Sequence, residues 1–325
     1  MANLSTESYK ESIETLSFLP SFIRVARPLH WVKNFALFAA LIFTGNLYTK
    51  IFLDRTVLAF IAFCLATSAT YIFNDIWDIK RDSLHPHKKF RPIASGELPI
   101  SVAFAEAFIF AAASIFLAAK LNPLFLFSVI GYLVMQALYS LVLKNLAIID
   151  ILIIAAGFIL RVYAGAFVIN AHLSVWFLLC VISVALFLAS GKRRAELGVI
   201  SASSGATRQS LTKYSKSLLD SYVTMFGNAA WLSWALFTFF ESPQATVPVW
   251  LFLAELSRTT TVNKMLMITI PLVIFGIMRY ESLIFEDRTE APEKILLTDI
   301  PLLASVAIWI GLVIWILYSG VSTVA

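Results

Sequence analysis

Charged side chains are scarce in this sequence. Asp, Glu, Lys and Arg make up 14% of the 325 residues, whereas hydrophobic residues make up 59% and the mean hydropathy is +0.83. A soluble domain carries about 25% charged residues. The scarcity of charge therefore excludes an ordinary soluble enzyme and predicts a protein that crosses the bilayer several times.

Cysteine and the common catalytic motifs are also sparse. The two cysteines, Cys64 and Cys180, lie inside apolar runs and indicate neither a disulfide framework nor a zinc site. The sequence has no glycine-rich phosphate loop, nucleophile elbow or HExxH helix, which excludes the enzyme classes that those motifs mark. The net charge of +5 is modest: it suits an anionic substrate or lipid leaflet and gives no reason to expect nucleic acid.

Long apolar stretches take the place of these features. A helix needs roughly 20 apolar residues to cross a bilayer, and we predict an all-α membrane protein with nine such helices. We expect one integral-membrane domain over residues 1–325, of which residues 1–20 are a polar N-terminal segment. The predicted spans are Lys33–Tyr48, Val57–Trp77, Val102–Ala119, Pro123–Leu143, Ile148–Ile169, Val175–Ala189, Leu218–Phe240, Met265–Phe285 and Ile300–Tyr318.

The positions of lysine and arginine predict the orientation. With the N-terminus in the cytoplasm, inner segments hold 19 of the 25 Lys and Arg residues, outer loops hold 5, and Arg161 lies within a helix. Cytoplasmic loops of membrane proteins are enriched in these cations. We therefore expect an integral protein of a bacterial inner or plasma membrane, with its charge-rich segments and its active site at the cytoplasmic face.

The most informative stretch is NDIWDIKRDSLHPHKKFRPIASGEL, from Asn74 to Leu98. On a helix of about 3.6 residues per turn, Asn74, Asp78 and Asp82 share one face. Mg²⁺ prefers hard oxygen ligands and keeps substrate phosphates in its shell. Carboxylates followed at once by cations predict a Mg²⁺ site for a diphosphate. The alternative is a charged loop that only orients the protein, but such loops rarely space carboxylates every four residues.

A second acidic motif is missing. Enzymes that ionise a prenyl diphosphate usually carry two, but the other long inner segment, Gly191–Ser217, opens with Lys192, Arg193 and Arg194 and contains no aspartate. Asp150 has no acidic partner four residues later. One carboxylate cluster beside many cations favours a ligand with more phosphate and fewer metal ions, because Arg and Lys both bind phosphate oxygens.

Arg161 is the charge that is hardest to explain by packing alone. A charge in mid-helix is costly and by default marks a site or a buried pair. Asp150 lies eleven residues earlier, about three turns, so both side chains can face one cavity. The alternative is a structural pair, either Asp150 with Lys144 or Glu106 with Arg161.

Three further residues lie near helix ends. Lys33 stands at the entry of the first span, where a lysine either binds phosphate or extends to the lipid headgroups. Tyr139 and Tyr214 either donate a hydrogen bond to a phosphate or lie at the membrane interface. We include Lys33 and Tyr139 among the candidate substrate-binding residues.

These motifs also carry a resemblance. NDIWDIKRD (Asn74–Asp82), in a protein predicted to have nine helices, resembles the first motif of the UbiA superfamily of intramembrane prenyltransferases. The extension to Leu98, RPLHWVKN (Arg27–Asn34), YSLVLKNLAIIDILIIAAGFILR (Tyr139–Arg161) and GKRRAEL (Gly191–Leu197) are similar to its decaprenyl-phosphate phosphoribosyltransferase branch. The resemblance covers nearly the whole chain and implies a UbiA-like bundle. The missing second aspartate motif is the departure from ordinary members.

The resemblance implies that a polyprenyl phosphate attacks the anomeric carbon of 5-phosphoribosyl 1-diphosphate and displaces pyrophosphate. The expected partners are these two substrates and the bilayer, with Mg²⁺ as cofactor; a homo-oligomer is compatible with the sequence. We expect Asn74, Asp75, Asp78 and Asp82 to hold the metal, and Asp78, Asp82 and Asp150 to be catalytic. The expected substrate-binding residues are Lys33, Lys88, Arg91, Tyr139, Lys144, Arg161, Lys192, Arg193 and Arg194.

Two other functions fit parts of the sequence. A prenyltransferase of the same fold that joins a prenyl diphosphate to an aromatic acceptor should carry a second acidic metal site, which this sequence lacks. A transporter should place polar residues at mid-membrane in repeat-related helices. The mid-membrane polar residues here are mainly Arg161, Glu106 and Gln136, and the remaining charges gather at one face.

Overall fold

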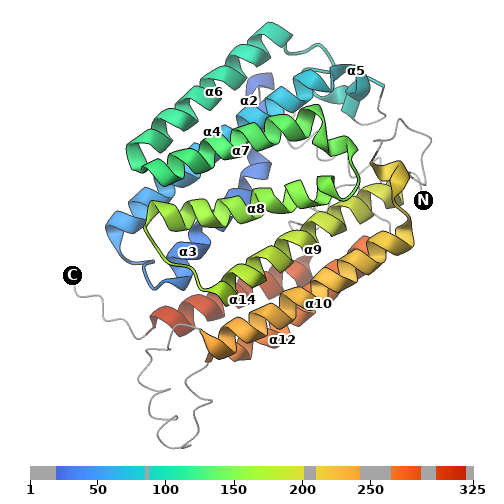
Figure 1. Cartoon of the computed structure of the whole chain (residues 1–325). Coiled ribbons are helices and arrows are strands. Elements are labelled where there is room, and N and C mark those ends of the chain that lie inside the picture. The colour runs from blue at the N-terminus through green and yellow to red at the C-terminus, as the bar shows by residue number, and fades with distance from the viewer. Residues whose placement is uncertain (1–19, 85–87, 201–209, 242–264, 287–297, 320–325) are drawn as a thin grey trace, which may run out of the picture. The chain divides into compact units, whose positions relative to one another are not determined.

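A computed structural model of the chain describes residues 20–84, 88–200, 210–241, 265–286 and 298–319 (Figure 1). Every regular element within those ranges is helical. Eight helices are long and apolar enough to cross a membrane: α4 (Lys50–Trp77), α6 (Ile100–Leu121), α7 (Pro123–Leu141), α8 (Ile149–Val168), α9 (Val175–Ile200), α10 (Lys216–Phe240), α12 (Ile270–Phe285) with its leading turn η6 (Met265–Thr269), and α14 (Ile300–Tyr318). The all-α membrane architecture is therefore confirmed.

The first predicted span is not a regular helix. Over Lys33–Tyr48 the chain forms part of the 3₁₀ segment η1 (Pro28–Leu37), then the short α3 (Phe38–Phe43), and then turns. Runs of 3₁₀ helix longer than three or four residues are uncommon, because their hydrogen-bond geometry is poor. The count of nine spans and the cytoplasmic N-terminus stay predictions, and the predicted polar segment 1–20 lies outside the described residues except for Pro20.

The sixth predicted span, Val175–Ala189, ends too early. Helix α9 continues to Ile200, so Lys192, Arg193 and Arg194 lie on a helix and not at the start of a loop. The extension KRRAEL is built of good helix formers. Arg193 also pairs with Glu196 one turn later at 2.5 Å, a spacing that stabilises helices.

The chain forms two compact units. The first holds residues 1–37, 54–169 and 200–214, and the second holds 38–53, 170–199 and 215–325. The prediction of a single domain stays a prediction. In the first unit, α7 packs against both α6 and α8, as Figure 1 shows, and η1 packs against α8. In the second, α12 packs against α10 and α14.

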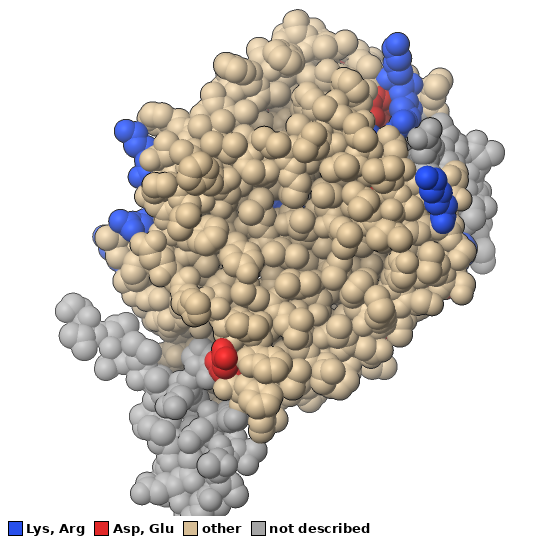
Figure 2. Space-filling view, viewed as in Figure 1, with Lys and Arg blue, Asp and Glu red and all other residues tan. Residues whose placement is uncertain are grey.

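Local sequence explains where several helices begin. Asn122 caps α7, because its side-chain oxygen accepts a hydrogen bond from the Phe125 amide at 2.7 Å, and Pro123 follows at the first helical position. Ser215 caps α10 and Asp299 caps α14 in the same way. The helix surfaces are apolar, and most of the face in Figure 2 consists of uncharged residues. Such surfaces suit contact with lipid.

A close backbone crossing holds η1 in the first unit. Gly165 of α8 faces the Leu37 carbonyl, and a Cβ added at Gly165 would lie 2.0 Å from that oxygen and 2.8 Å from its carbon. Only glycine allows this approach. The crossing fixes the end of η1, which carries the buried Asn34, against α8, which carries the buried Arg161.

We predict that Gly165→Ala lowers the free energy of unfolding by about 3 kcal/mol, because the new methyl group must displace backbone and not a flexible side chain. Thermal unfolding in detergent measures the effect. Gly131→Ala on α7 is the matched control, since a Cβ there meets no atom within 4 Å. Equal midpoints for the two variants would contradict the close crossing.

Candidate functional site

The acidic motif lies where α4 ends. Asn74 and Asp75 belong to its last turn, and Asp78 joins it to the one-turn helix α5 (Ile79–Asp82). The Asp78 amide donates to the Asn74 carbonyl at 3.0 Å, and the Asp82 amide donates to the Asp78 carbonyl at 2.8 Å. The predicted helical spacing of Asn74, Asp78 and Asp82 is confirmed. Their side chains, however, form two groups, each joined by a different cation.

Lys144 joins the first pair of these side chains. Its ammonium nitrogen lies 2.7 and 2.6 Å from the two carboxylate oxygens of Asp78 and 3.4 Å from the side-chain oxygen of Asn74. Lys144 belongs to the short turn η3 (Leu143–Asn145) before α8 and is 1% exposed. Three hard oxygens therefore converge on one buried cation.

Two arginines hold the second pair. Arg91 contacts Asp75 at 3.0 Å and Asp82 at 2.5 Å through the same nitrogen. Arg27 donates to both Asp75 oxygens at 2.5 and 2.6 Å and stacks on Tyr71. Asp82 thus shares its cation with Asp75 and not with Asp78, a grouping that helical spacing alone did not predict.

The buried charges shift one another's proton affinity. Burial raises the pKa of the Asp82 carboxyl above its ordinary value, although the positive charge of Arg91 acts in the opposite direction. Burial also disfavours the charged form of Arg27, but the neighbouring Asp75 outweighs it and holds the pKa of Arg27 above its ordinary value. The Arg27 charge is therefore a permanent part of the site.

Arg161 lies deeper in the first unit, among neutral partners. Its guanidinium donates to the Asn34 side-chain oxygen at 2.7 Å, the Gly157 carbonyl at 2.7 Å and the Tyr132 hydroxyl at 2.8 Å. It also stacks over the Tyr132 ring. Within the described ranges no carboxylate pairs with it, so the alternative of a Glu106–Arg161 pair is wrong. A buried cation held by neutral dipoles keeps its charge available to an anion.

Asp150 is fully buried at the start of α8. One of its oxygens accepts a hydrogen bond from the Tyr214 hydroxyl at 2.7 Å. Tyr214 is therefore a buried partner of Asp150 and not a lipid-interface residue. The contact favours a positioning role for Asp150 over direct contact with substrate.

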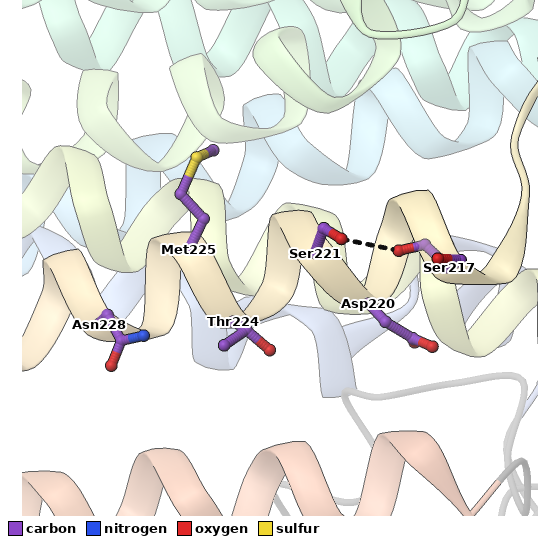
Figure 3. Close-up of a pocket in the computed structure, with 6 residues that line it drawn as sticks. All are labelled: Ser217, Asp220, Ser221, Thr224, Met225 and Asn228. Atoms are coloured by element: carbon purple, nitrogen blue, oxygen red, sulfur yellow. Dashed lines mark hydrogen bonds between the residues drawn. The ribbon is translucent and has the colours of Figure 1, made fainter.

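The predicted basic group of α9 belongs to the second unit. Arg193 is fully buried beside Glu196, Arg194 contacts Asp220 of α10 at 2.5 Å, and Lys192 is half-buried. Asp220 also lines a cavity of about 600 Å³ along α10, with Ser217, Ser221, Thr224, Met225 and Asn228 (Figure 3). The joint action of this group and the acidic motif stays a prediction.

The remaining candidates lie in the first unit. Lys33 on η1, Lys88 on the short turn η2 (Lys88–Phe90) and Tyr139 on α7 are each half-buried. The positive charge of Lys88 lowers the proton affinity of Asp82, which places it near the acidic motif. Three residues of this unit's polar network had no assigned role in the sequence prediction: Arg27, Asn34 and Tyr132. Single polar residues give no periodic signal, so only their contacts show their role.

The donor set fits a hard divalent cation, although no three His, Cys, Asp or Glu side chains in the described part of the chain form a metal cluster. The fit rests on Asn74 and Asp78, whose oxygens already surround a positive charge, the Lys144 ammonium. Carboxylate and amide oxygens are suitable ligands for Mg²⁺.

Comparison with known proteins identifies relatives of the chain. Residues 34–240 match the model of the UbiA prenyltransferase family. A decaprenyl-phosphate phosphoribosyltransferase of Corynebacterium glutamicum is 33% identical over 305 residues, which are 91% of this chain and 86% of that protein. The enzyme of the same name from Mycolicibacterium smegmatis is 33% identical over 73% of this chain and 76% of that protein.

The fold also has a solved counterpart. A UbiA homologue from Archaeoglobus fulgidus, bound to GPP and Mg²⁺, superimposes with a TM-score of 0.66. It covers 91% of this chain and 99% of its own, at 18% sequence identity. This likeness confirms the predicted UbiA-like bundle.

We predict that Asp75→Asn lowers the free energy of unfolding by about 3 kcal/mol, because it leaves Arg27 and Arg91 without the buried negative charge between them. The thermal midpoint in detergent measures the loss. Asp54→Asn, at an exposed position of the same helix, should change it by less than about 0.5 kcal/mol. A midpoint for Asp75→Asn equal to that of the control would show that the arginines do not depend on Asp75.

Proposed function

This chain belongs to the UbiA prenyltransferase family, and on that basis we propose that it is an integral-membrane, Mg²⁺-dependent phosphoribosyltransferase. It transfers 5-phosphoribose from 5-phosphoribosyl 1-diphosphate to a polyprenyl phosphate of the decaprenyl type and releases pyrophosphate. The observation that carries the proposal is the similarity to decaprenyl-phosphate phosphoribosyltransferases along nearly the whole chain. The acidic motif, paired with the half-buried Arg27 and Arg91 and the buried Lys144, supports it.

The chemistry needs positioning and charge neutralisation more than proton transfer. An oxygen of the lipid phosphate forms a bond to the anomeric carbon, while the bond from that carbon to the diphosphate oxygen breaks. The nucleophile is already an anion, so no strong general base is required. The protein must hold two anionic reactants together and stabilise the charge that develops on the departing pyrophosphate.

The acidic motif serves the diphosphate of the donor. Asn74, Asp78 and Asp82 would hold Mg²⁺, with Asp75 assisting. Bound Mg²⁺ supplies positive charge to the leaving pyrophosphate. The Lys144 ammonium contacts the side chains of Asn74 and Asp78, so it also lies where it can contact the same diphosphate. Because Asn74 and Asp78 point at one cation, this pair is the centre of the donor site.

The other cations bind phosphate groups. Lys88 and Arg91 flank the motif and bind the donor. Lys192, Arg193 and Arg194 on α9 are further proposed phosphate-binding residues. Arg161 and Lys33 serve the donor or the lipid phosphate, assisted by Tyr139. For Arg161 the support is its burial among neutral groups, which leaves its charge for an anion. The whole site faces the cytoplasm, as the distribution of Lys and Arg favours.

A transferase assay on the purified protein in detergent tests the reaction. We expect pyrophosphate release from 5-phosphoribosyl 1-diphosphate only when decaprenyl phosphate and Mg²⁺ are both present. A panel of shorter and longer lipid phosphates then reports the preferred chain. Turnover of a prenyl diphosphate with an aromatic acid, in place of this pair, would overturn the proposal and support the other activity of the family.

We predict that Asp78→Asn lowers the Mg²⁺-dependent rate of phosphoribosyl transfer at least 100-fold. The variant loses the carboxylate that is proposed to bind Mg²⁺ and that pairs with Lys144. The thermal midpoint should fall much less than that of Asp75→Asn, since the Asn side chain still accepts from Lys144. Asp54→Asn is the activity control. A wild-type rate for Asp78→Asn would refute the metal assignment.

A further inference from the structure

The loop between α7 and α8 contains a strained residue. Ile148 has φ of 70° and ψ of −50°, although it is β-branched and not glycine. Side chains of this kind rarely adopt positive φ, because Cβ approaches the backbone. Such a conformation persists only where the surroundings hold it, and it clusters at functional sites. Contacts around the loop must therefore fix Ile148.

The Tyr214 hydroxyl provides that contact. The Ile148 amide donates to the Tyr214 oxygen at 2.5 Å, and the hydroxyl in turn donates to Asp150 at 2.7 Å. The hydroxyl has a single hydrogen and gives it to Asp150, so its oxygen keeps lone pairs that accept from the Ile148 amide. Tyr214 is 7% exposed and Asp150 is 0% exposed, so water does not replace these bonds easily.

The same loop carries Lys144 to the acidic motif. Backbone hydrogen bonds tie the two ends of this loop together: the Leu146 amide donates to the Leu143 carbonyl at 3.1 Å, and the Asp150 amide donates to the Leu146 carbonyl at 3.0 Å. Lys144 lies four residues before Ile148, and its buried ammonium contacts Asp78. A loop that relaxed at Ile148 would therefore move the turn that presents Lys144.

We propose that Tyr214 is a positioning residue: its hydroxyl holds the strained Ile148 loop, so that Lys144 is kept on Asn74 and Asp78 where the diphosphate of the donor binds. The inference rests on the proposed function for the identity of that ligand. The geometry of the loop does not depend on that identity. It is supported by the hydrogen bonds that join Ile148 and Asp150 to Tyr214. Tyr214 acts through Lys144 and not by direct contact with substrate.

Tyr214→Phe tests the proposal, because it removes only the hydroxyl. Tyr163→Phe on α8 is the matched control, since the Tyr163 hydroxyl makes no hydrogen bond to the described residues. In Tyr214→Phe we expect hydrogen–deuterium exchange of a peptide spanning residues 144–150 to be at least tenfold faster than in wild type. We expect no change in the control.

Kinetics separate positioning from loss of folded protein. We expect Tyr214→Phe to raise the KM for 5-phosphoribosyl 1-diphosphate about tenfold and to leave the KM for decaprenyl phosphate unchanged. A fall in the folded fraction alone would lower kcat and move neither KM. That outcome, or a donor KM equal to that of Tyr163→Phe, overturns the proposal.

A second variant tests the role of strain. Glycine adopts positive φ without a steric penalty, so Ile148→Gly should let the loop keep its course without the hydroxyl. In that background Tyr214→Phe should change the donor KM less than threefold. An undiminished tenfold effect would overturn the strain argument. If wild-type protein does not turn over this substrate pair, the proposed function fails, whereas unchanged exchange over residues 144–150 in Tyr214→Phe would overturn the loop assignment itself.

Discussion

The pairing of buried carboxylates with cations at the end of α4 is the constraint on which the candidate site depends. A charge removed from water is costly unless an opposite charge lies close by. Asp75, Asp78 and Asp82 meet this condition through Arg27, Arg91 and Lys144. The three cations come from the segment before η1, the loop after α5 and the turn before α8. Charge balance thus brings the acidic motif together with Arg27, 48 positions before Asp75, and with Lys144, 66 positions after Asp78.

The same pairing separates two roles within one short motif. Asp75 is 3% exposed and held by two arginines, so its main effect is to fix the segments around it. Asp78 is more accessible, with 13% of its side chain exposed, and its ion pair with the Lys144 ammonium is 2.6 Å long. A divalent ion held by Asn74, Asp78 and Asp82 would add positive charge beside Lys144, while Arg27 continues to neutralise Asp75.

Arg161 shows a different solution to the same cost. It is buried in a membrane-spanning helix, yet its partners among the described residues are an amide, a carbonyl and a phenol. These dipoles satisfy its hydrogen bonds without cancelling its charge. The close crossing of Gly165 and Leu37 helps to fix this network, because it holds the segment that carries Asn34 against the helix that carries Arg161.

The sequence alone determined the class of the molecule and the location of its chemistry. Apolar stretches gave most of the helices, and α14 begins and ends where its apolar run does, because the length of a span is set by the bilayer. The four-residue spacing of Asn74, Asp78 and Asp82 identified the acidic motif. Only the tertiary structure decided which cation joins which carboxylate and that Tyr214 is a partner of Asp150. These features depend on contacts between residues as many as 70 positions apart, as for Lys144 and Asn74, and such contacts leave no periodic pattern along the chain.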